Sequence, residues 1–450
     1  MQQLTTVDAA NLYMETPTSY WHVATLVVFD GTTSDGATAE RMKERYRERL
    51  PLLSPMRRKV VEVPLHVDYP YWADDPELDL DQHIEQISLP PPGDDQQLGE
   101  LVAELTAGPL DRSRPLWKLY VIDGLPDGQI AHLTLIHHAT ADGVAFVRIQ
   151  MNLLDHDADG GHEPIPERVN EDAPTQAQML GNALTNAATA PLRWGRAGAR
   201  LLSSIPQLAG VVQNTSLDEA PPTPFNDTIG PDRAVAFTSI SLDEMRIIKD
   251  VHGVTLNDVV LATSAGALRT YLQRIDSLPA EPLRAMIPVS VRMDDEPDVY
   301  GNQVSATMTS LHTDVDDPIE RLQLIGDSMA IAKKTATAIP GDVLGELEAL
   351  VPSMVAESAV RMVGRVRPFN VVVSNVPGPR IPLYADGAEM LHYYPFAPIV
   401  DGLGLNISLF SYDGQIEFGL NACRELVPDV WDLCTMLHDA FDELRTAPAT

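Results

Sequence analysis

The first half of the chain interleaves short apolar runs with polar helical segments. Residues 22–29 alternate in the manner of a half-buried strand, and the charged stretch 37–50 is typical of a surface helix. Residues 119–122 and 131–138 predict two strands joined by a turn of Asp, Gly and Pro, with a helix soon after. This interleaving predicts a mixed α/β domain over residues 1–160.

The pattern changes between residues 161 and 232. A polar stretch rich in Pro, Glu and Asp comes first, an Ala-rich helical segment follows over 176–213, and the loop 220–225 contains three prolines. Such a composition is typical of a connection that carries its own helix. We therefore expect a helical crossover linker over 161–232.

A second series of strand and helix patterns follows the linker. Residues 235–240 predict a strand, and Ser241 with Glu244 forms a capping-box signature for the next helix. Later markers of the same kind are a helix start at Asp317-Pro318 and a hairpin turn at Asp413-Gly414. The sequence therefore predicts a second α/β domain over 233–450.

Composition and charge narrow the class of protein. The chain has 450 residues, 44% of them hydrophobic, which is enough apolar material for two packed cores. Its formal charge of −32 repels the phosphate backbone that dominates nucleic-acid affinity, so we expect no DNA or RNA partner. The same sign opposes attraction of the whole molecule to an anionic membrane, although a local patch can still dock there.

Cysteine usage and the N-terminus bear on the compartment. Cys423 and Cys434 are too few for a disulfide framework and form no CxxC pair. The first ten residues lack the basic and apolar regions of a signal peptide, and no stretch approaches the roughly eighteen apolar residues of a membrane span. We expect a cytoplasmic protein, soluble or peripheral at the inner membrane face or at lipid droplets.

The most distinctive motif is His137-His138-Ala139-Thr140-Ala141-Asp142-Gly143, placed where a strand ends and a helix begins. Strand alternation puts Leu133, Leu135 and His137 on one apolar face and His138 on the opposite, more polar face. A neutral imidazole can take a proton from an attacking hydroxyl near physiological pH, so we expect His138 to be a general base and His137 to be secondary. The alternative is a hydrogen-bonded histidine beside a helix cap.

The end of the motif supports its structure. The Asp142 carboxylate can cap the following helix, and Gly143 permits a tight turn that brings the chain close to His138 and a bound substrate. Because the two histidines lie on opposite faces of the strand, one metal ion cannot bind both of them, and no third ligand has a recognisable spacing. We therefore expect no metal site.

Other motifs follow in a fixed order along the chain. They are Leu4-Thr5-Thr6-Val7-Asp8-Ala9, Pro115-Leu116-Trp117, Asn257-Asp258, Pro288-Val289-Ser290-Val291-Arg292, Gly301-Asn302 and Ser374-Asn375-Val376-Pro377-Gly378-Pro379. With the histidine motif, this set resembles the bacterial wax ester synthase/acyl-CoA:diacylglycerol acyltransferase family. That family belongs to the chloramphenicol-acetyltransferase-like superfamily, which also includes peptide-synthetase condensation domains. The resemblance covers essentially the whole chain.

The resemblance implies an α/β (α+β) fold of two chloramphenicol-acetyltransferase-like domains, with mixed sheets flanked by helices and an active-site tunnel at the domain interface. It implies that a fatty acyl-CoA and diacylglycerol enter this tunnel as substrates, with no metal or redox cofactor. The motif supplies a base and no adjacent serine or cysteine nucleophile, so direct acyl transfer is expected. A long-chain alcohol, a carrier-bound acceptor and a non-catalytic role at lipid bodies remain alternatives.

The chain departs from the family at one place near the N-terminus. Where the family often has Met-His-Val, this sequence has Trp21-His22-Val23. The departure leaves the histidine motif intact and predicts a reshaped substrate pocket.

Each secondary motif has a structural and a functional interpretation. Asp258 stands at the third position of a helix capped by Thr255, so we expect it to be structural. The Asn257 amide can orient the acceptor or stabilise an oxyanion. Pro115 and Trp117 are expected to form a turn with a buried aromatic anchor.

The later motifs concern the walls of the site. Arg292, at the end of a strand-like run, can pair with Asp142 and is expected to be structural. Ser374 and Asn375 precede a rigid Pro-Gly-Pro turn and are expected either to end a strand or to form part of the pocket wall.

The Ala-rich segment forms a positive island in an acidic chain. It contains Arg193, Arg196 and Arg200, and no acidic residue occurs from Pro174 through Leu217. Two interpretations remain open, which are an interfacial helix at a membrane or lipid droplet and a helix that bridges the two domains.

Overall fold

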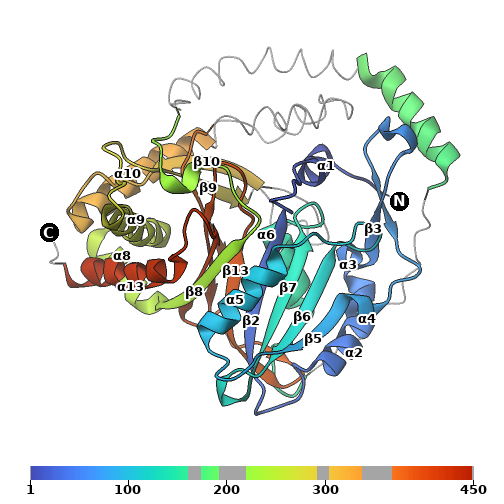
Figure 1. Cartoon of the computed structure of the whole chain (residues 1–450), viewed down its shortest axis with the longest axis horizontal. Helices are drawn as coiled ribbons and strands as arrows, with labels where there is room; N and C mark the ends of the chain where they lie inside the picture. The colour runs from blue at the N-terminus through green and yellow to red at the C-terminus, as the bar shows by residue number, and fades with distance from the viewer. Residues whose placement is uncertain (1, 161–173, 192–218, 291–303, 337–366, 448–450) are drawn as a thin grey trace.

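Two six-stranded sheets form the frame of the molecule (Figure 1). The computed structural model describes residues 2–160, 174–191, 219–290, 304–336 and 367–447. Mixed sheets flanked by helices confirm the predicted fold class. Within the described residues, no helix is both long enough and apolar enough to cross a bilayer.

The N-terminal sheet has the strand order β12-β13-β2-β7-β6-β5. Its strands are β2 (His22–Asp30), β5 (Ile84–Ser88), β6 (Trp117–Asp123), β7 (Gln129–His137), β12 (Tyr384–Ala385) and β13 (Ala388–Phe396). All neighbours are antiparallel except β5 and β6. The strands β12 and β13 come from the C-terminal half of the chain. The domain boundaries at 160 and 233 stay a prediction. The sheet order shows in addition that residues 384–396, from the predicted second domain, contribute two strands to the N-terminal sheet.

Helices cover both faces of this sheet. One face packs against α2 (Ala39–Arg49), α3 (Ser54–Arg57), α4 (Leu80–His83) and α6 (Gly143–Met151), and the other against α5 (Asp95–Thr106). The helix α1 (Thr6–Tyr13) packs instead against Trp72, Leu116 and Ala139. On β2, Val23, Val27 and Phe29 pack in one apolar cluster, while Leu26 and Val28 pack in another. The prediction of a half-buried strand at 22–29 is therefore wrong, because the sheet is covered on both sides.

A small sheet lies beside the N-terminal half, with the order β1-β4-β3. Its strands are β1 (Gln2–Gln3), β3 (Arg58–Val61) and β4 (Tyr71–Asp74). A helix over residues 176–191, part of the predicted Ala-rich segment, packs there through Met179 against Val63 and Tyr71. Short 3₁₀ turns at Leu50–Leu52, Pro64–His66, Pro126–Gly128 and Pro224–Asn226 connect the elements.

The C-terminal sheet has the order β10-β9-β11-β14-β15-β8. Its strands are β8 (Arg233–Ser241), β9 (Arg284–Ser290), β10 (Val304–Ser310), β11 (Val371–Pro377), β14 (Leu405–Tyr412) and β15 (Gln415–Cys423). The helices α8 (Leu242–His252), α9 (Leu256–Arg274), α10 (Pro318–Ala336) and α13 (Val430–Thr446) gather on one face of it (Figure 1). Leu405, Ile407 and Leu409 of β14 belong to the large apolar cluster on that face. The opposite face is turned toward the N-terminal half.

Local signals in the second half are mostly confirmed. The helix α10 begins at Pro318, and β14 and β15 form a hairpin around Asp413 and Gly414. Ser241 caps α8 by accepting a hydrogen bond from the Glu244 backbone N–H at 3.3 Å. The reciprocal glutamate contact of a capping box is absent there, so only half of that prediction is correct.

Candidate active site

A largely apolar cavity lies between the N-terminal half and the C-terminal sheet. Its empty space, including the open mouth, measures about 1350 Å³. Side chains of the N-terminal half line one wall, among them Val23, His138 and Phe146, and the C-terminal sheet lines the other with Val372, Asn406 and Phe410. Such a cavity can hold long hydrocarbon chains away from water.

His138 stands at the edge of this cavity, one residue beyond the end of β7. Its backbone N–H donates to the Trp21 carbonyl at 2.8 Å, which extends the pairing of β7 with the segment before β2. The Asn11 side-chain amide lies 3.5 Å from His138 Nδ1 and 3.4 Å from the His138 carbonyl oxygen. The Trp21 ring meets the imidazole edge-on, with centroids 6.1 Å apart. The strand end thus presents this imidazole to the cavity.

His137 lies in the core instead and is fully buried. Its Nδ1 accepts a hydrogen bond from the Ala139 backbone N–H at 3.0 Å, so the proton of a neutral ring is on Nε2. That Nε2 lies 3.0 Å from Oε1 of Glu15. Burial lowers the pKa of His137 although the Glu15 carboxylate opposes the shift. His137 therefore holds the loop that carries His138.

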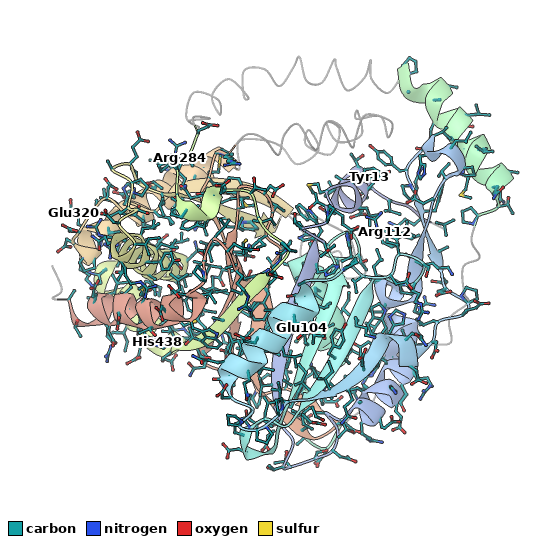
Figure 2. All side chains as sticks on the ribbon, in the orientation of Figure 1. Tyr13, Glu104, Arg112, Arg284, Glu320 and His438 are labelled. Atoms are coloured by element: carbon teal, nitrogen blue, oxygen red, sulfur yellow. The ribbon has the colours of Figure 1, made fainter. Side chains whose placement is uncertain are left out.

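Arg112 anchors Glu15 from the other side. Its guanidinium forms an ion pair with Glu15 and donates to the Leu12 carbonyl at 2.7 Å. Figure 2 shows Arg112 close to Tyr13, at the end of α1. Burial alone raises the pKa of the Glu15 carboxyl, but His137 and Arg112 together bring it below the ordinary value. This partly exposed ion pair and the contact of Glu15 with His137 link the end of α1 to the histidine motif.

Asp142 is the N-cap of α6 and is fully buried. Its Oδ1 accepts a hydrogen bond from the Ala145 N–H at 2.8 Å, and its carbonyl accepts one from the Phe146 N–H at 2.8 Å. Gly143 lines the cavity at the first position of the helix. The φ of Gly143 lies outside the left-handed region, and a Cβ there would lie 3.6 Å from Val376 Cγ2. The absence of a side chain at Gly143 leaves space beside His138.

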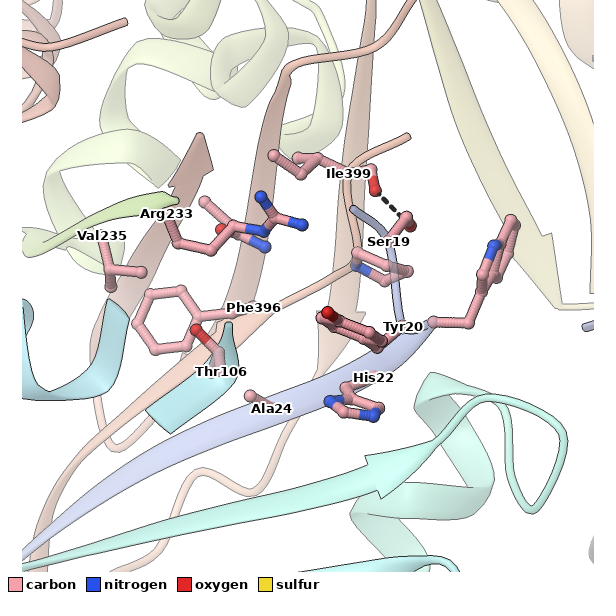
Figure 3. A pocket seen from close by; sticks show the side chains of 12 residues that line it. Ser19, Tyr20, His22, Ala24, Thr106, Arg233, Val235, Phe396 and Ile399 are labelled. Atoms are coloured by element: carbon pink, nitrogen blue, oxygen red, sulfur yellow. Dashed lines mark hydrogen bonds between the residues drawn. The ribbon is translucent and has the colours of Figure 1, made fainter. Parts of the chain in front are cut away.

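The departure at Trp21 changes the backbone and the pocket. Trp21 has a φ of 53°, which bulky residues seldom adopt. Its ring lines the cavity beside His138 and also a second, more polar cavity lined by Tyr20, His22 and Arg233 (Figure 3). Burial, and then the nearby His137, lowers the pKa of His22 to about 3. His22 is therefore a neutral neighbour of the motif.

Some residues of the secondary motifs line the cavity, and others only support the elements around it. Ser374 lines the cavity. Asn375 and Asn257 come together, with Asn375 Nδ2 3.5 Å from Asn257 Oδ1, but neither is among the residues that line the cavity. Asp258 completes a capping box with Thr255, whose N–H donates to Asp258 Oδ2 at 2.8 Å. These two asparagines thus connect α9 to β11.

Trp117 is a buried anchor, 1% exposed, two residues after the buried Pro115. Its indole N–H donates to the Met56 carbonyl at 2.8 Å. The ring stacks between Tyr46 and His83, with centroids 4.9 Å and 4.4 Å away. This residue supports β6 and is not among those that line the cavity.

Several predictions lie outside the described residues. They concern Arg292 and its pairing with Asp142, Gly301-Asn302, and the arginines Arg193, Arg196 and Arg200. In the described part of the chain, no group of three His, Cys, Asp or Glu side chains is arranged to bind a metal ion.

Four residues of the site were not predicted from the sequence. Asn11 and Glu15 reach the motif from α1 and the turn after it, and no local pattern marks them. Asn406 and Ser408 line the cavity from β14. Their signal is two polar positions on one face of the otherwise apolar run 405–410, which strand alternation could have identified.

Comparison with known proteins places the chain in one family. Its residues 4–260 match the wax ester synthase/diacylglycerol acyltransferase catalytic domain, and residues 300–445 match the C-terminal domain of the same family. A Mycobacterium tuberculosis protein named as a diacylglycerol O-acyltransferase is 36% identical over 455 residues, which cover 98% of each chain.

Solved structures agree with this assignment. The wax ester synthase/diacylglycerol acyltransferase of Marinobacter aquaeolei superposes with a TM-score of 0.73 at 29% identity, over 99% of this chain and 98% of the other. The first condensation domain of the CDA synthetase, at 15% identity, shares the fold with a TM-score of 0.62, over 100% and 97% of the two chains. The chain therefore belongs to the wax ester synthase/diacylglycerol acyltransferase family.

Proposed function

We propose that this protein transfers a long-chain fatty acyl group from acyl-CoA to diacylglycerol and so forms triacylglycerol. The observation that carries the proposal is the position of His138, whose imidazole opens into a large apolar cavity in a chain of this family. A general base beside a space for hydrocarbon chains suits the joining of two lipid substrates.

In the proposed reaction, His138 removes the proton from the acceptor hydroxyl. The oxygen attacks the thioester carbonyl carbon, and a tetrahedral intermediate forms. Its collapse breaks the carbon–sulfur bond, and the imidazolium returns its proton to the CoA sulfur. The transfer is direct, and the chemistry needs neither a metal nor a redox cofactor. General-base assistance of this kind contributes about 10²- to 10⁴-fold, and holding the two substrates together supplies much of the remainder.

The surroundings of His138 support this role by holding the imidazole in place. The backbone bond to Trp21, the Asn11 amide and the Asp142 cap act on consecutive parts of one loop. Such a loop can keep the reacting nitrogen in position while substrates exchange. Asp142 and His137 are positioning residues in this scheme.

We rank diacylglycerol first among the possible acceptors, because relatives that are 36% identical over 98% of the chain are named diacylglycerol O-acyltransferases. A long-chain alcohol is the second, since it presents the same hydroxyl on an apolar body and the family name includes wax ester synthesis. Two further alternatives are a carrier-bound acceptor and a non-catalytic protein at the surface of lipid bodies.

The test is CoA release from palmitoyl-CoA with diacylglycerol, with hexadecanol and without acceptor. The wild type, His138→Ala and His156→Ala are compared, since His156 is exposed and serves as the matched histidine control. We expect release that depends on acceptor and is lost only in His138→Ala. Release that neither acceptor raises above background would overturn the storage-lipid function and favour a carrier-bound substrate.

We also propose peripheral contact with a membrane or lipid-droplet surface, through the arginines at 193, 196 and 200. Flotation with liposomes tests this contact. Replacing all three arginines with alanine should reduce the fraction of protein that floats with the liposomes. An unchanged fraction would contradict membrane contact through these arginines.

A further inference from the structure

Two polar side chains interrupt the apolar wall that the C-terminal sheet presents to the cavity. Asn406 and Ser408 of β14 line the cavity, while Leu405, Ile407 and Leu409 belong to the apolar cluster under the helices, although Leu405 and Leu409 also border the cavity. Both polar residues are only 3% exposed. Their partners on the neighbouring strand β11 are Val372 and Ser374, which line the same wall.

A hydrogen bond fixes the orientation of the Asn406 amide. The Ser408 hydroxyl donates to Asn406 Oδ1 at 2.7 Å, so the amide oxygen is engaged and the NH₂ group is directed away from Ser408. Among the described residues, this NH₂ group donates no hydrogen bond. The NH₂ group also retains some exposed surface, and Asn406 lines the cavity, so a bound molecule can reach this donor. An amide donor of this kind is satisfied only by water or by an acceptor atom of the bound substrate.

A long-chain alcohol and diacylglycerol differ in the polar groups that they carry besides the reacting hydroxyl. A long-chain alcohol has one polar group, the hydroxyl that reacts, and the remainder of the molecule is hydrocarbon. Diacylglycerol carries two ester carbonyls besides its reacting hydroxyl, and each ester that enters an apolar cavity loses its hydrogen bonds to water. A buried amide donor compensates this loss for diacylglycerol and is left unsatisfied by the alcohol.

We propose that the Asn406 amide, oriented by Ser408, donates a hydrogen bond to an ester carbonyl of diacylglycerol and thereby selects this acceptor over a long-chain alcohol. This inference rests on the proposed function, and it names the residue that sets the acceptor class.

The first test changes the substrate and needs no variant. Palmitoyl-CoA is supplied with dipalmitoylglycerol, with the diether dihexadecylglycerol or with hexadecanol, and kcat/KM is measured by CoA release. The diether has nearly the same shape as the diester and lacks the carbonyl oxygens. We expect the wild type to prefer the diester over the diether by about tenfold, as for a site built to hydrogen-bond its substrate.

The second test changes the protein. Asn406→Leu keeps the approximate size of the side chain and removes the donor, so the diester preference over both the diether and hexadecanol should fall about tenfold. Ser408→Ala releases the amide from its fixed orientation, and the same ratios should fall about threefold. Val372→Leu is the matched control, because it alters the shape of the same wall without a polar group and should change all three acceptors alike.

The outcomes separate this inference from the proposed function. A wild type that uses none of the three acceptors overturns the proposed function and, with it, the assignment of Asn406. A wild type that is active but treats diester and diether alike overturns the inference alone. An Asn406→Leu variant that loses activity equally with all acceptors also overturns it, since the amide would then contact the thioester carbonyl that every reaction shares.

Discussion

The two walls of the cavity are built in different ways. The wall of the N-terminal half presents His138 from an irregular loop, which is held by contacts from α1, from Trp21 in a left-handed conformation and from the α6 cap. The wall of the C-terminal sheet consists of regular strands, and Val372, Ser374, Asn406 and Ser408 on them line the cavity. A reacting group needs a fixed position, which requires several contacts from distant segments, whereas the recognition of hydrocarbon needs only an apolar strand face.

This comparison predicts two kinds of variant. Changes that loosen the loop wall should lower the rate with every acceptor alike, and changes in the strand wall, such as Asn406→Leu, should alter the choice of acceptor. The following predictions test the loop side of this difference.

The largest effect is expected for Asp142→Ala. The loss of the α6 cap should cost about 1 kcal/mol of stability, and displacement of the loop should lower kcat about 100-fold with both diacylglycerol and hexadecanol. Asp94 caps α5 through the same kind of bond, to the Gln97 N–H at 2.9 Å, and lies far from the motif in sequence. Asp94→Ala should therefore lose similar stability in a denaturant titration and retain activity; equal loss of activity in both variants would contradict a role for Asp142 in positioning.

A smaller effect is expected for Glu15→Leu. Without the carboxylate, the buried Nε2–H of His137 loses its nearby acceptor, and the free energy of unfolding should fall by about 1–3 kcal/mol. Activity should fall with both acceptors in parallel, because His137 holds the loop of His138. Glu85 forms an exposed ion pair with Lys118 at 3.0 Å, and Glu85→Leu should stay within about 0.5 kcal/mol of the wild type. If the two variants were equally stable, the contact between Glu15 and His137 would have no structural role.

Acid should weaken the N-terminal sheet, which carries the loop wall. Burial lowers the pKa of His22 to about 3 and that of His132 to about 4. Both histidines titrate near 6.5 in the unfolded chain, so below that pH the unfolded state binds more protons and stability falls as the pH falls toward the folded values. Between pH 7.5 and 5, the free energy of unfolding should drop by about 1–2 kcal/mol per buried histidine.

Urea titrations of His132→Gln at the two pH values measure the contribution of this residue. The drop should be smaller in this variant than in the wild type, whereas His438→Gln, which changes an exposed histidine, should retain the full drop. An identical drop in all three proteins would show that His132 is protonated in the folded state as readily as in the unfolded chain.

The smallest effect is expected for Gly143→Ala. The added methyl would lie in ordinary contact with Val376, so the fold should keep its stability to within about 1 kcal/mol. The methyl also reduces the space beside His138, and KM for both acceptors should rise by a few fold at most. A change in acceptor preference would instead place Gly143 in recognition, and it would remove the contrast between the two walls.

Local sequence patterns determined a large part of this protein. Strand alternation and turn residues predicted β6, β7 and the hairpin of β14 and β15, and the motif residues predicted the cap of α6 by Asp142. The placement of His138 at the end of a strand was also predicted, although β7 ends one residue earlier than expected. These features depend on neighbours within a few residues, so the sequence specifies them without knowledge of the remaining chain.

Only the tertiary structure decided how distant segments meet. The strand β13 pairs with β2 although more than 350 residues separate them, and this pairing brings the C-terminal half against the N-terminal sheet. The contacts of Asn11 and Glu15 with the histidines, and the shared cavity of His138 and Asn406, arise in the same way. The physical reason is that the alternation along a strand determines which face of the sheet a side chain occupies. The element that packs against that face depends on how whole sheets pack against one another.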